Sequence, residues 1–271
     1  MQMKKLQLAS QTVAYYESGG DGQPVLLIHG NSASGLTFRH QLESELGNTH
    51  RLIALDLPGH GDSDPAPDSS AYGMPGYAAV VAEAAEALGM ADAVLVGWSL
   101  GGHIALEAHN YLPQAKGFVI YGTPPLAFPP DMANAFLPNP AVNVGFTAVV
   151  SEADALTYAT SFFAPNAEID PAPFIADILR TDGNARVGLA ASIKPDGYQD
   201  EVAIVANLTR PLAILHGAEE QLVSEPYISS LTMPTLWRGR VQIIPGAGHA
   251  PHWEQPQAFN NLLTNFLAEI G

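Results

Sequence analysis

The chain of 271 residues contains no cysteine. A disulfide framework, a thiolate metal site and a cysteine nucleophile are therefore excluded. Basic side chains are also scarce, since 11 Lys and Arg stand against 27 Asp and Glu and the formal net charge is −16. Such an acidic chain is a poor partner for nucleic acid or for an anionic membrane surface. We interpret the charge as a contribution to solubility.

Long apolar runs are missing as well. No run approaches the roughly 18 apolar residues of a membrane span, and the residues after the charged start (1–5) form no unbroken apolar stretch of the kind that marks a signal peptide. We therefore expect a cytoplasmic protein without a membrane partner. A content of 47% hydrophobic and 14% charged residues is typical of a globular protein. The length suits one large domain, with room for an insertion.

Several binding motifs are absent from the sequence. Neither H-x-H-x-D-H nor H-E-x-x-H occurs, so the usual spacing of a zinc lactonase or protease is missing. No G-x-G-x-x-G follows a strand and no G-x-x-x-x-G-K-S/T occurs, so no nucleotide is indicated. We expect no metal and no cofactor.

The sequence does contain a nucleophile motif. An apolar run (93–96) predicts a buried strand, and the residues from Ile104 onward predict an apolar helix. Between them lies Gly97-x-Ser99-x-Gly101, a G-x-S-x-G turn that holds Ser99 in a strained conformation with its hydroxyl exposed. Free N–H groups at the start of the helix can stabilise negative charge there. Ser99 is therefore the candidate nucleophile.

Strands and helices alternate along most of the chain. An opening hairpin is expected at 6–8 and 12–16, and a helical face at 38–46. Near-continuous apolar strands are expected at 25–28, 52–55, 93–96, 117–121, 212–215 and 241–244, with further helices at 74–88, 104–112 and 258–270. This pattern predicts an α/β protein with a mostly parallel central sheet flanked by helices.

The alternation stops between residues 126 and 208. This stretch is rich in proline, has no convincing core strand and contains short helical segments such as 153–163 and 174–180. We expect it to be a helical cap inserted into a core formed by residues 1–125 and 209–271.

Reactive groups of such sheets gather at the carboxyl ends of the strands. The residues that follow the expected strands are Asn31, Asp56, Ser99, Thr123, Glu219, Glu220 and His249. A serine nucleophile needs a base, and that base needs an acid to orient it. Of the nine histidines, His249 follows the last strand and fits the chain order Ser, acid, His. His252 is the second choice. We expect five further histidines to be structural or supporting: His29, His60, His103, His109 and His216.

The acid and the oxyanion site are chosen by position. Thr123 occupies one place where an acid could stand, which leaves Glu219 and Glu220, and the spacing from Gly217 favours Glu220. An oxyanion hole needs two donors. The N–H of Leu100, directly after the nucleophile, is one of them. The N–H of Asn31 is the natural second, and the Asn31 amide could also contact substrate.

Longer stretches carry a family resemblance. HGN (29–31), DLPGHG (56–61), G-x-S-x-G and Gly248-His249 resemble the α/β-hydrolase superfamily. HGNSxSG (29–35), GWSLGGHI (97–104), GTPP (122–125), TDGxAR (181–186) and AGHAP (247–251) together resemble the AidH-type N-acyl-homoserine lactonases, which are metal-independent hydrolases. One departure from the family pattern is His216, before Gly217.

The resemblance implies an α/β-hydrolase fold and a role for each matching residue. Ser99 would be the nucleophile, Glu220 the acid and His249 the base. Asn31 and Leu100 would form the oxyanion hole. A substrate-contacting tyrosine of the family's cap matches Tyr158, and Trp98 would join Asn31 and Tyr158 in binding substrate.

The implied function is opening of the lactone ring of N-acyl-homoserine lactones by Ser-His-Glu catalysis. The partner would be a small ester or lactone, and the oligomeric state is not indicated. The alternatives are a broad carboxylesterase, an acylase that cuts the amide, a C–C bond hydrolase of the same fold and a non-catalytic ligand receptor. An intact triad argues against the receptor. Dehalogenases and epoxide hydrolases of this fold carry an aspartate at the place of Ser99. Whether Ser99 forms an acyl-enzyme or His249 activates water stays open.

Overall fold

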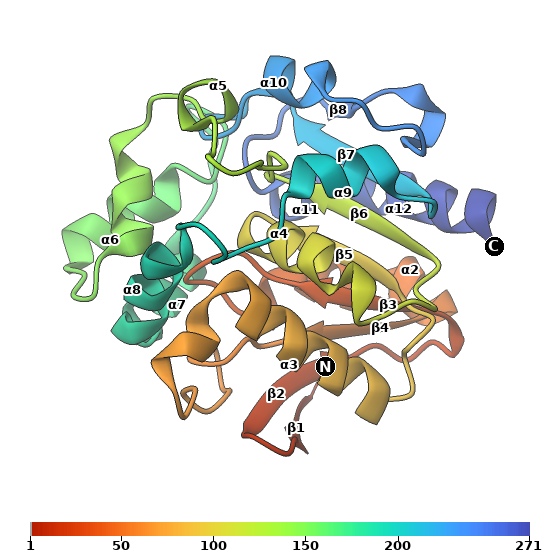
Figure 1. Ribbon diagram of the computed structural model, residues 1–271, viewed down its shortest axis with the longest axis horizontal. Coiled ribbons are helices and arrows are strands. Elements are labelled where there is room, and N and C mark those ends of the chain that lie inside the picture. Colours follow the sequence, from red (N-terminus) through yellow and green to blue (C-terminus); the bar gives the residue numbers. More distant parts are fainter. Residues whose placement is uncertain (1) are drawn as a thin grey trace.

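A computed structural model describes residues 2–271 apart from the side chain of Ser70; Met1, part of the expected core range 1–125, lies outside the described residues. Across this described part runs an eight-stranded sheet with the order β1-β2-β4-β3-β5-β6-β7-β8 (Figure 1). The strands are β1 (Met3–Gln7), β2 (Thr12–Glu17), β3 (Gly22–Ile28), β4 (His50–Leu55), β5 (Val94–Trp98), β6 (Gly117–Tyr121), β7 (Leu212–Gly217) and β8 (Gln242–Ile244).

The pairing of the strands confirms the expected sheet. β1 and β2 form an antiparallel hairpin, and β2 pairs antiparallel with β4. From β4 to β8 every neighbouring pair is parallel. All five residues of β5 and all five of β6 are buried, because a parallel strand with helices on both faces has no solvent side.

Helices cover both faces of the sheet. Figure 1 shows α3, α4 and α9 in front of the strands, and α12 behind them. Outside the stretch between β6 and β7, the α-helices are α1 (Arg39–Leu42), α2 (Glu45–Thr49), α3 (Met74–Ala87), α4 (Leu100–Glu107), α10 (Glu225–Ser230), α11 (Pro251–Glu254) and α12 (Pro256–Ile270). Short 3₁₀-helices there are η1 (Gly35–Phe38), η2 (Ser69–Tyr72), η3 (Ala108–Asn110) and η5 (Trp237–Gly239).

The expectation of one helical face over 38–46 is wrong. The chain forms η1, α1 and α2 in succession, with a break at Ser44. Ser44 is extended, with φ −97° and ψ 178°, and stands immediately before α2. Its hydroxyl donates a hydrogen bond to the Gln41 carbonyl. A serine that bonds its own backbone in this way competes with a continuous helix.

The stretch between β6 and β7 is helical. It contains α5 (Met132–Ala135), η4 (Pro140–Phe146), α6 (Glu152–Thr160), α7 (Ala172–Arg180), α8 (Gly183–Ser192) and α9 (Glu201–Asn207). The short helices expected at 153–163 and 174–180 correspond to α6 and α7. A capping box between Ser151 and Asp154 begins α6. α6 packs on α7, whereas α9 packs on α4 and so lies against the sheet.

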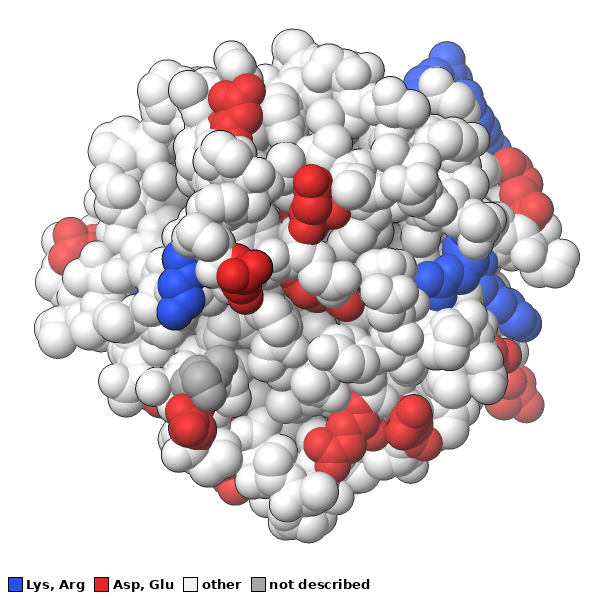
Figure 2. Space-filling view, viewed as in Figure 1, with Lys and Arg blue, Asp and Glu red and all other residues white. Residues whose placement is uncertain are grey.

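The surface in Figure 2 carries scattered acidic side chains, with Lys and Arg at a few separate places. None of the helices in residues 2–271 is both long enough and apolar enough to cross a membrane.

Candidate active site

Ser99 lies at the sharp turn between β5 and α4. Its backbone has φ 54° and ψ −119°, a conformation that residues other than glycine rarely adopt. Its N–H donates to the Tyr121 carbonyl at 2.8 Å. The glycines on either side permit this turn, because a Cβ at Gly97 would lie 2.2 Å from the Gly101 carbonyl oxygen and one at Gly101 would lie 2.1 Å from the Ile28 carbonyl oxygen. The strained serine of a nucleophile elbow is thus present.

His249 and Glu220 form a buried pair next to this turn. The distance between His249 Nδ1 and Glu220 Oε2 is 2.8 Å, and the two side chains are 3% and 2% exposed. Burial raises the pKa of Glu220, but attraction to His249 and the hydrogen bonds from His249 and the Leu222 N–H outweigh it, so that the pKa falls below its ordinary value. Glu220 is therefore a carboxylate, which can only accept. His249 Nδ1 carries the proton, and Nε2 is left as the basic nitrogen.

Glu219 has a different partner. Its Oε2 accepts a hydrogen bond of 3.0 Å from the Ala247 N–H, in the turn that leads to His249. The neighbouring glutamates therefore act on separate groups. Glu220 bonds the imidazole, and Glu219 holds the turn.

Asn31 and Leu100, the expected oxyanion residues, line the same cavity as Ser99. Leu100 is the first residue of α4, and Asn31 follows β3 by three residues. The Asn31 amide donates a 2.6 Å hydrogen bond to the carbonyl of Gly145, in η4. A Cβ at Gly30 would approach Trp98 and Ser99 to 3.1–3.2 Å, so the turn before Asn31 packs directly on the nucleophile elbow.

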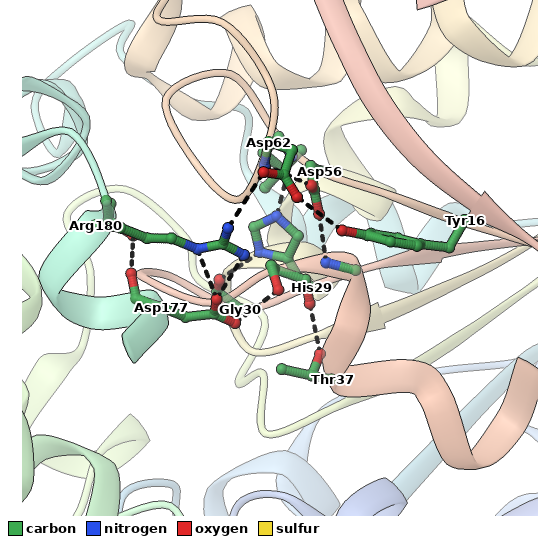
Figure 3. Close-up of polar contacts among 12 residues, drawn as sticks. Tyr16, His29, Gly30, Thr37, Asp56, Asp62, Asp177 and Arg180 are labelled. Atoms are coloured by element: carbon green, nitrogen blue, oxygen red, sulfur yellow. Dashed lines mark hydrogen bonds and ion pairs between the residues drawn. The ribbon is translucent and has the colours of Figure 1, made fainter. Parts of the chain in front are cut away.

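A polar network holds the loop after β3 to α7 (Figure 3). Asp177 of α7 accepts a 2.6 Å hydrogen bond from Ser34 and bonds Arg180. Arg180 also reaches Asp62 at 3.4 Å. Asp56, a candidate from the sequence, accepts a 2.6 Å hydrogen bond from the N–H of Gly35. It does not line the cavity that contains Ser99. These contacts hold Ser34 and Gly35, in the loop that contains Asn31, to α7 and to Asp56.

Ser99, His249, Asn31, Leu100 and Tyr158 all line one cavity. Much of the remaining lining is apolar and comes from the helical stretch, including Leu126, Met132, Phe136, Phe146, Leu189 and Ile193. Burial raises the pKa of Tyr158 above its ordinary value, so its hydroxyl is a neutral donor and acceptor. An apolar cavity with a few polar groups at one end suits a small ligand that has a polar head and an apolar tail.

Trp98 and Thr123 lie beside the cavity rather than in its lining. Trp98 is buried, and its indole N–H donates to the His249 carbonyl at 2.8 Å. The Thr123 hydroxyl donates to the Ser99 carbonyl at 2.7 Å. Trp98 therefore holds the backbone of His249, and Thr123 holds the backbone of Ser99.

Sequence reasoning missed His103, which was expected to be structural or supporting. The structure places it in the lining of the same cavity. It is the fourth residue of α4, the helix that Ser99 caps, so this spacing places it one helical turn from Ser99. That spacing was the available signal. Within residues 2–271, no group of three or more His, Asp or Glu side chains is placed to hold a metal ion.

A strained serine at a strand-to-helix turn, a buried carboxylate–histidine pair and a parallel sheet define a hydrolase architecture. The model of the alpha/beta hydrolase family matches residues 25–262, so the chain belongs to that family. Its similarity to lactonases and esterases shows that it is a hydrolase that acts on ester bonds.

Individual relatives are similar over their whole length. A mutant of the N-acyl homoserine lactonase AidH, complexed with N-hexanoyl homoserine lactone, is 36% identical with a TM-score of 0.95, covering 100% of this chain and 98% of that one. The pimeloyl-(acyl-carrier protein) methyl ester esterase of Xylella fastidiosa is 27% identical over 94% of this chain and 99% of its own. A Synechocystis sp. protein named as a non-heme chloroperoxidase is 25% identical over 93% and 94%.

Proposed function

We propose that this protein is a metal-independent serine hydrolase that opens the lactone ring of N-acyl-homoserine lactones and so quenches quorum-sensing signals. The observation that carries the proposal is that Ser99 and His249 line one apolar cavity while Glu220 hydrogen-bonds His249. The likeness to AidH, at 36% identity over the whole chain, supports the lactone as substrate.

The mechanism follows from the groups that meet in the cavity. His249 Nε2 takes the proton of Ser99 as its Oγ attacks the lactone carbonyl carbon. The oxyanion accepts hydrogen bonds from the N–H groups of Asn31 and Leu100. When the C–O bond of the ring breaks, the ring oxygen leaves as a hydroxyl with the proton from His249. Water, activated by His249, then hydrolyses the acyl-enzyme and releases the open N-acyl-homoserine.

Residues 126–208 act in this proposal as a cap that sets the acyl-chain preference. Their apolar side chains provide much of the cavity wall. Each CH₂ buried there contributes about 0.8 kcal/mol, so kcat/KM should rise with acyl length until the cavity is full. Closure of the cap would also exclude water from the reaction.

Tyr158 is the cap residue that we propose contacts the head of the substrate. It is buried in α6 and lines the cavity with Asn31. Tyr158→Phe should slow turnover of acyl-homoserine lactones more than turnover of p-nitrophenyl acetate, which has no amide. Equal losses on both substrates, or no loss on either, would show that the tyrosine has no role in recognising the head group.

A broad carboxylesterase and an amide-cutting acylase are the rival functions, because both use the same triad. A panel of N-acyl-homoserine lactones of increasing chain length, followed by mass spectrometry, separates them. We expect each product to gain one water without fragmentation, with unchanged rates after extended dialysis against EDTA. Free fatty acid with homoserine lactone would identify an acylase. Turnover of simple esters with no change in any lactone would identify an esterase, and a loss restored by zinc or manganese would contradict metal independence.

A further inference from the structure

A second histidine–carboxylate pair adjoins the cavity. His103 of α4 lines it, and its Nδ1 lies 2.9 and 2.8 Å from the two carboxylate oxygens of Glu201 in α9. Glu201 is wholly buried and also accepts a 2.8 Å hydrogen bond from the Leu126 N–H. Figure 1 shows α4 and α9 next to each other in front of the sheet. The mechanism proposed above uses neither side chain.

The pairing determines what His103 can offer to a ligand. Because the Glu201 oxygens accept from His103, Nδ1 carries a proton. Nε2 makes no hydrogen bond to any residue of the described chain, and the His103 side chain is 10% exposed although Glu201 is 0% exposed. Nε2 is therefore the one hydrogen-bonding group of this ring that is left for the cavity. It accepts when the ring is neutral and donates when the ring carries both protons.

The other polar side chains in the lining already have roles in the proposed reaction. Asn31, Ser99, Tyr158 and His249 act at the lactone head, and the helical stretch contributes mostly apolar groups. An exposed nitrogen in an otherwise apolar tail region loses hydration when an unsubstituted alkyl chain covers it. An acyl chain that carries an oxygen at that point would restore the lost hydrogen bond.

The position of His103 indicates which carbon would carry that oxygen. Ser99 is the N-cap of α4 and His103 is the fourth residue of that helix, so their backbones lie about 6 Å apart along the helix axis, and both side chains line the cavity. In an N-acyl-homoserine lactone, five bonds separate the attacked carbonyl carbon from the third carbon of the acyl chain. With bonds of about 1.3–1.5 Å, an extended chain covers about 6 Å over that interval. The two spans match.

We propose, resting on the function proposed above, that His103 recognises an oxygen on the third carbon of the acyl chain and so makes 3-hydroxy- or 3-oxoacyl-homoserine lactones the preferred substrates. Glu201 is a positioning residue that fixes the orientation and proton arrangement of the ring. A hydroxyl at this carbon donates to Nε2 of the neutral ring. An oxo group accepts from Nε2 only when that nitrogen is protonated.

The test compares kcat/KM for the unsubstituted, 3-hydroxy and 3-oxo forms of one chain length. The readout is the ratio of each substituted lactone to the unsubstituted one, because a general loss of activity or folding affects all three alike. One hydrogen bond contributes about 0.5–1.5 kcal/mol, so we expect a ratio of roughly 2 to 12 for at least one substituted lactone in the native enzyme. In His103→Leu the ratio should fall to about one.

Glu201→Gln provides a second variant that keeps the packing. Its amide oxygen can still accept from the Leu126 N–H, and its NH₂ group then donates to His103 Nδ1, which moves the ring proton to Nε2. The rate ratio of the 3-oxo to the 3-hydroxy lactone should therefore rise in this variant. A structural role in joining α4 to α9 would leave that ratio unchanged.

The outcomes separate the two proposals. If the native enzyme opens the unsubstituted lactone but gains nothing from either oxygen, the role of His103 is refuted while the lactonase function stands. Ratios that persist in His103→Leu, or an oxo-to-hydroxy ratio that stays the same in Glu201→Gln, also refute it. If no lactone of the three is opened, the proposed function itself fails.

Discussion

Glu220 and His249 lie 29 positions apart in the chain and are joined by a 2.8 Å hydrogen bond between Oε2 and Nδ1. The bond crosses from the loop after β7 to the loop after β8, two strands that pair in parallel. Because parallel neighbours end at the same edge of the sheet, their following loops meet there. The adjacent Glu219 is directed to the backbone N–H of Ala247 instead.

The first prediction separates the two glutamates. Glu220→Gln should lower kcat strongly, by about 10³-fold or more, because an amide no longer holds His249 in the basic tautomer or stabilises its charged form. Glu219→Gln keeps an oxygen acceptor for the Ala247 N–H and should cost less than about tenfold. Steady-state kinetics of both variants tests the assignment. A larger loss in Glu219→Gln, or equal mild losses in both, would contradict it.

The second prediction concerns the strain at Ser99. A positive φ on a residue other than glycine costs on the order of 1–3 kcal/mol, and this is partly offset by the greater freedom of glycine in the unfolded chain. Ser99→Gly should therefore have a higher free energy of unfolding than Ser99→Ala, by about 1 kcal/mol. Urea unfolding of the two variants measures the difference. Equal stability, or a more stable alanine variant, would mean that the turn stores no strain.

The third prediction uses the close approach at Gly145. A Cβ there would lie 2.7 Å from the Tyr158 hydroxyl and 2.9 Å from the Asn31 amide nitrogen. Gly145→Ala should displace one of these groups and lower kcat/KM for lactones by roughly 10- to 100-fold. Gly19→Ala is the matched control, since a Cβ at Gly19 has nothing within 4 Å. If the two variants have the same kcat/KM, the close approach of Gly145 to Tyr158 and Asn31 has no role in lactone turnover.

The fourth prediction concerns pH and the buried His252. Burial holds the pKa of His252 well below its ordinary value of 6.5, and its ring packs between Phe38, Trp98 and Tyr121. A histidine whose pKa is lower in the folded state contributes stability above the unfolded pKa, and this is lost as the pH falls through the folded pKa.

His252→Phe should therefore lose less stability than the native protein between pH 7.5 and 5.5. Below about pH 6.5 the two curves should diverge by about 1.4 kcal/mol per pH unit. Urea unfolding at four pH values measures the divergence, and all other titrating groups are common to both proteins. Parallel curves would show that His252 titrates normally in the folded state.

Most of the fold was predictable because the central strands are continuous apolar runs. Residues 93–96 and 117–121 correspond to β5 and β6, which are buried on both faces. The helix expected over 38–46 is interrupted at Ser44, which is extended and whose hydroxyl bonds the Gln41 carbonyl. The spacing of apolar residues does not reveal such a local preference of one polar side chain, so it did not predict the break.

Ser99 and His249 were selected from the sequence for a different reason, and their catalytic roles are part of the proposed function. A strained serine demands a fixed motif, and the loop after the last strand identifies His249 without any knowledge of side-chain packing. The choice of Glu220 also required its spacing from Gly217, and in the structure the Glu220 carboxylate hydrogen-bonds His249. His103 and Glu201 could not be paired from sequence, because 98 positions separate them and no motif surrounds Glu201. Their contact depends on how α9, the last helix of the stretch between β6 and β7, packs on α4.

The proposed function depends above all on the opening of the lactone ring by Ser99. The most direct measurement follows N-hexanoyl-homoserine lactone by mass spectrometry with native enzyme, with folded Ser99→Ala and in buffer alone, at a mildly acidic pH that slows spontaneous ring opening. We expect conversion to N-hexanoyl-homoserine by the native enzyme, and a rate for Ser99→Ala that is lower by at least about 10³-fold. Release of hexanoic acid, or ring opening by Ser99→Ala within tenfold of the native rate, would contradict it.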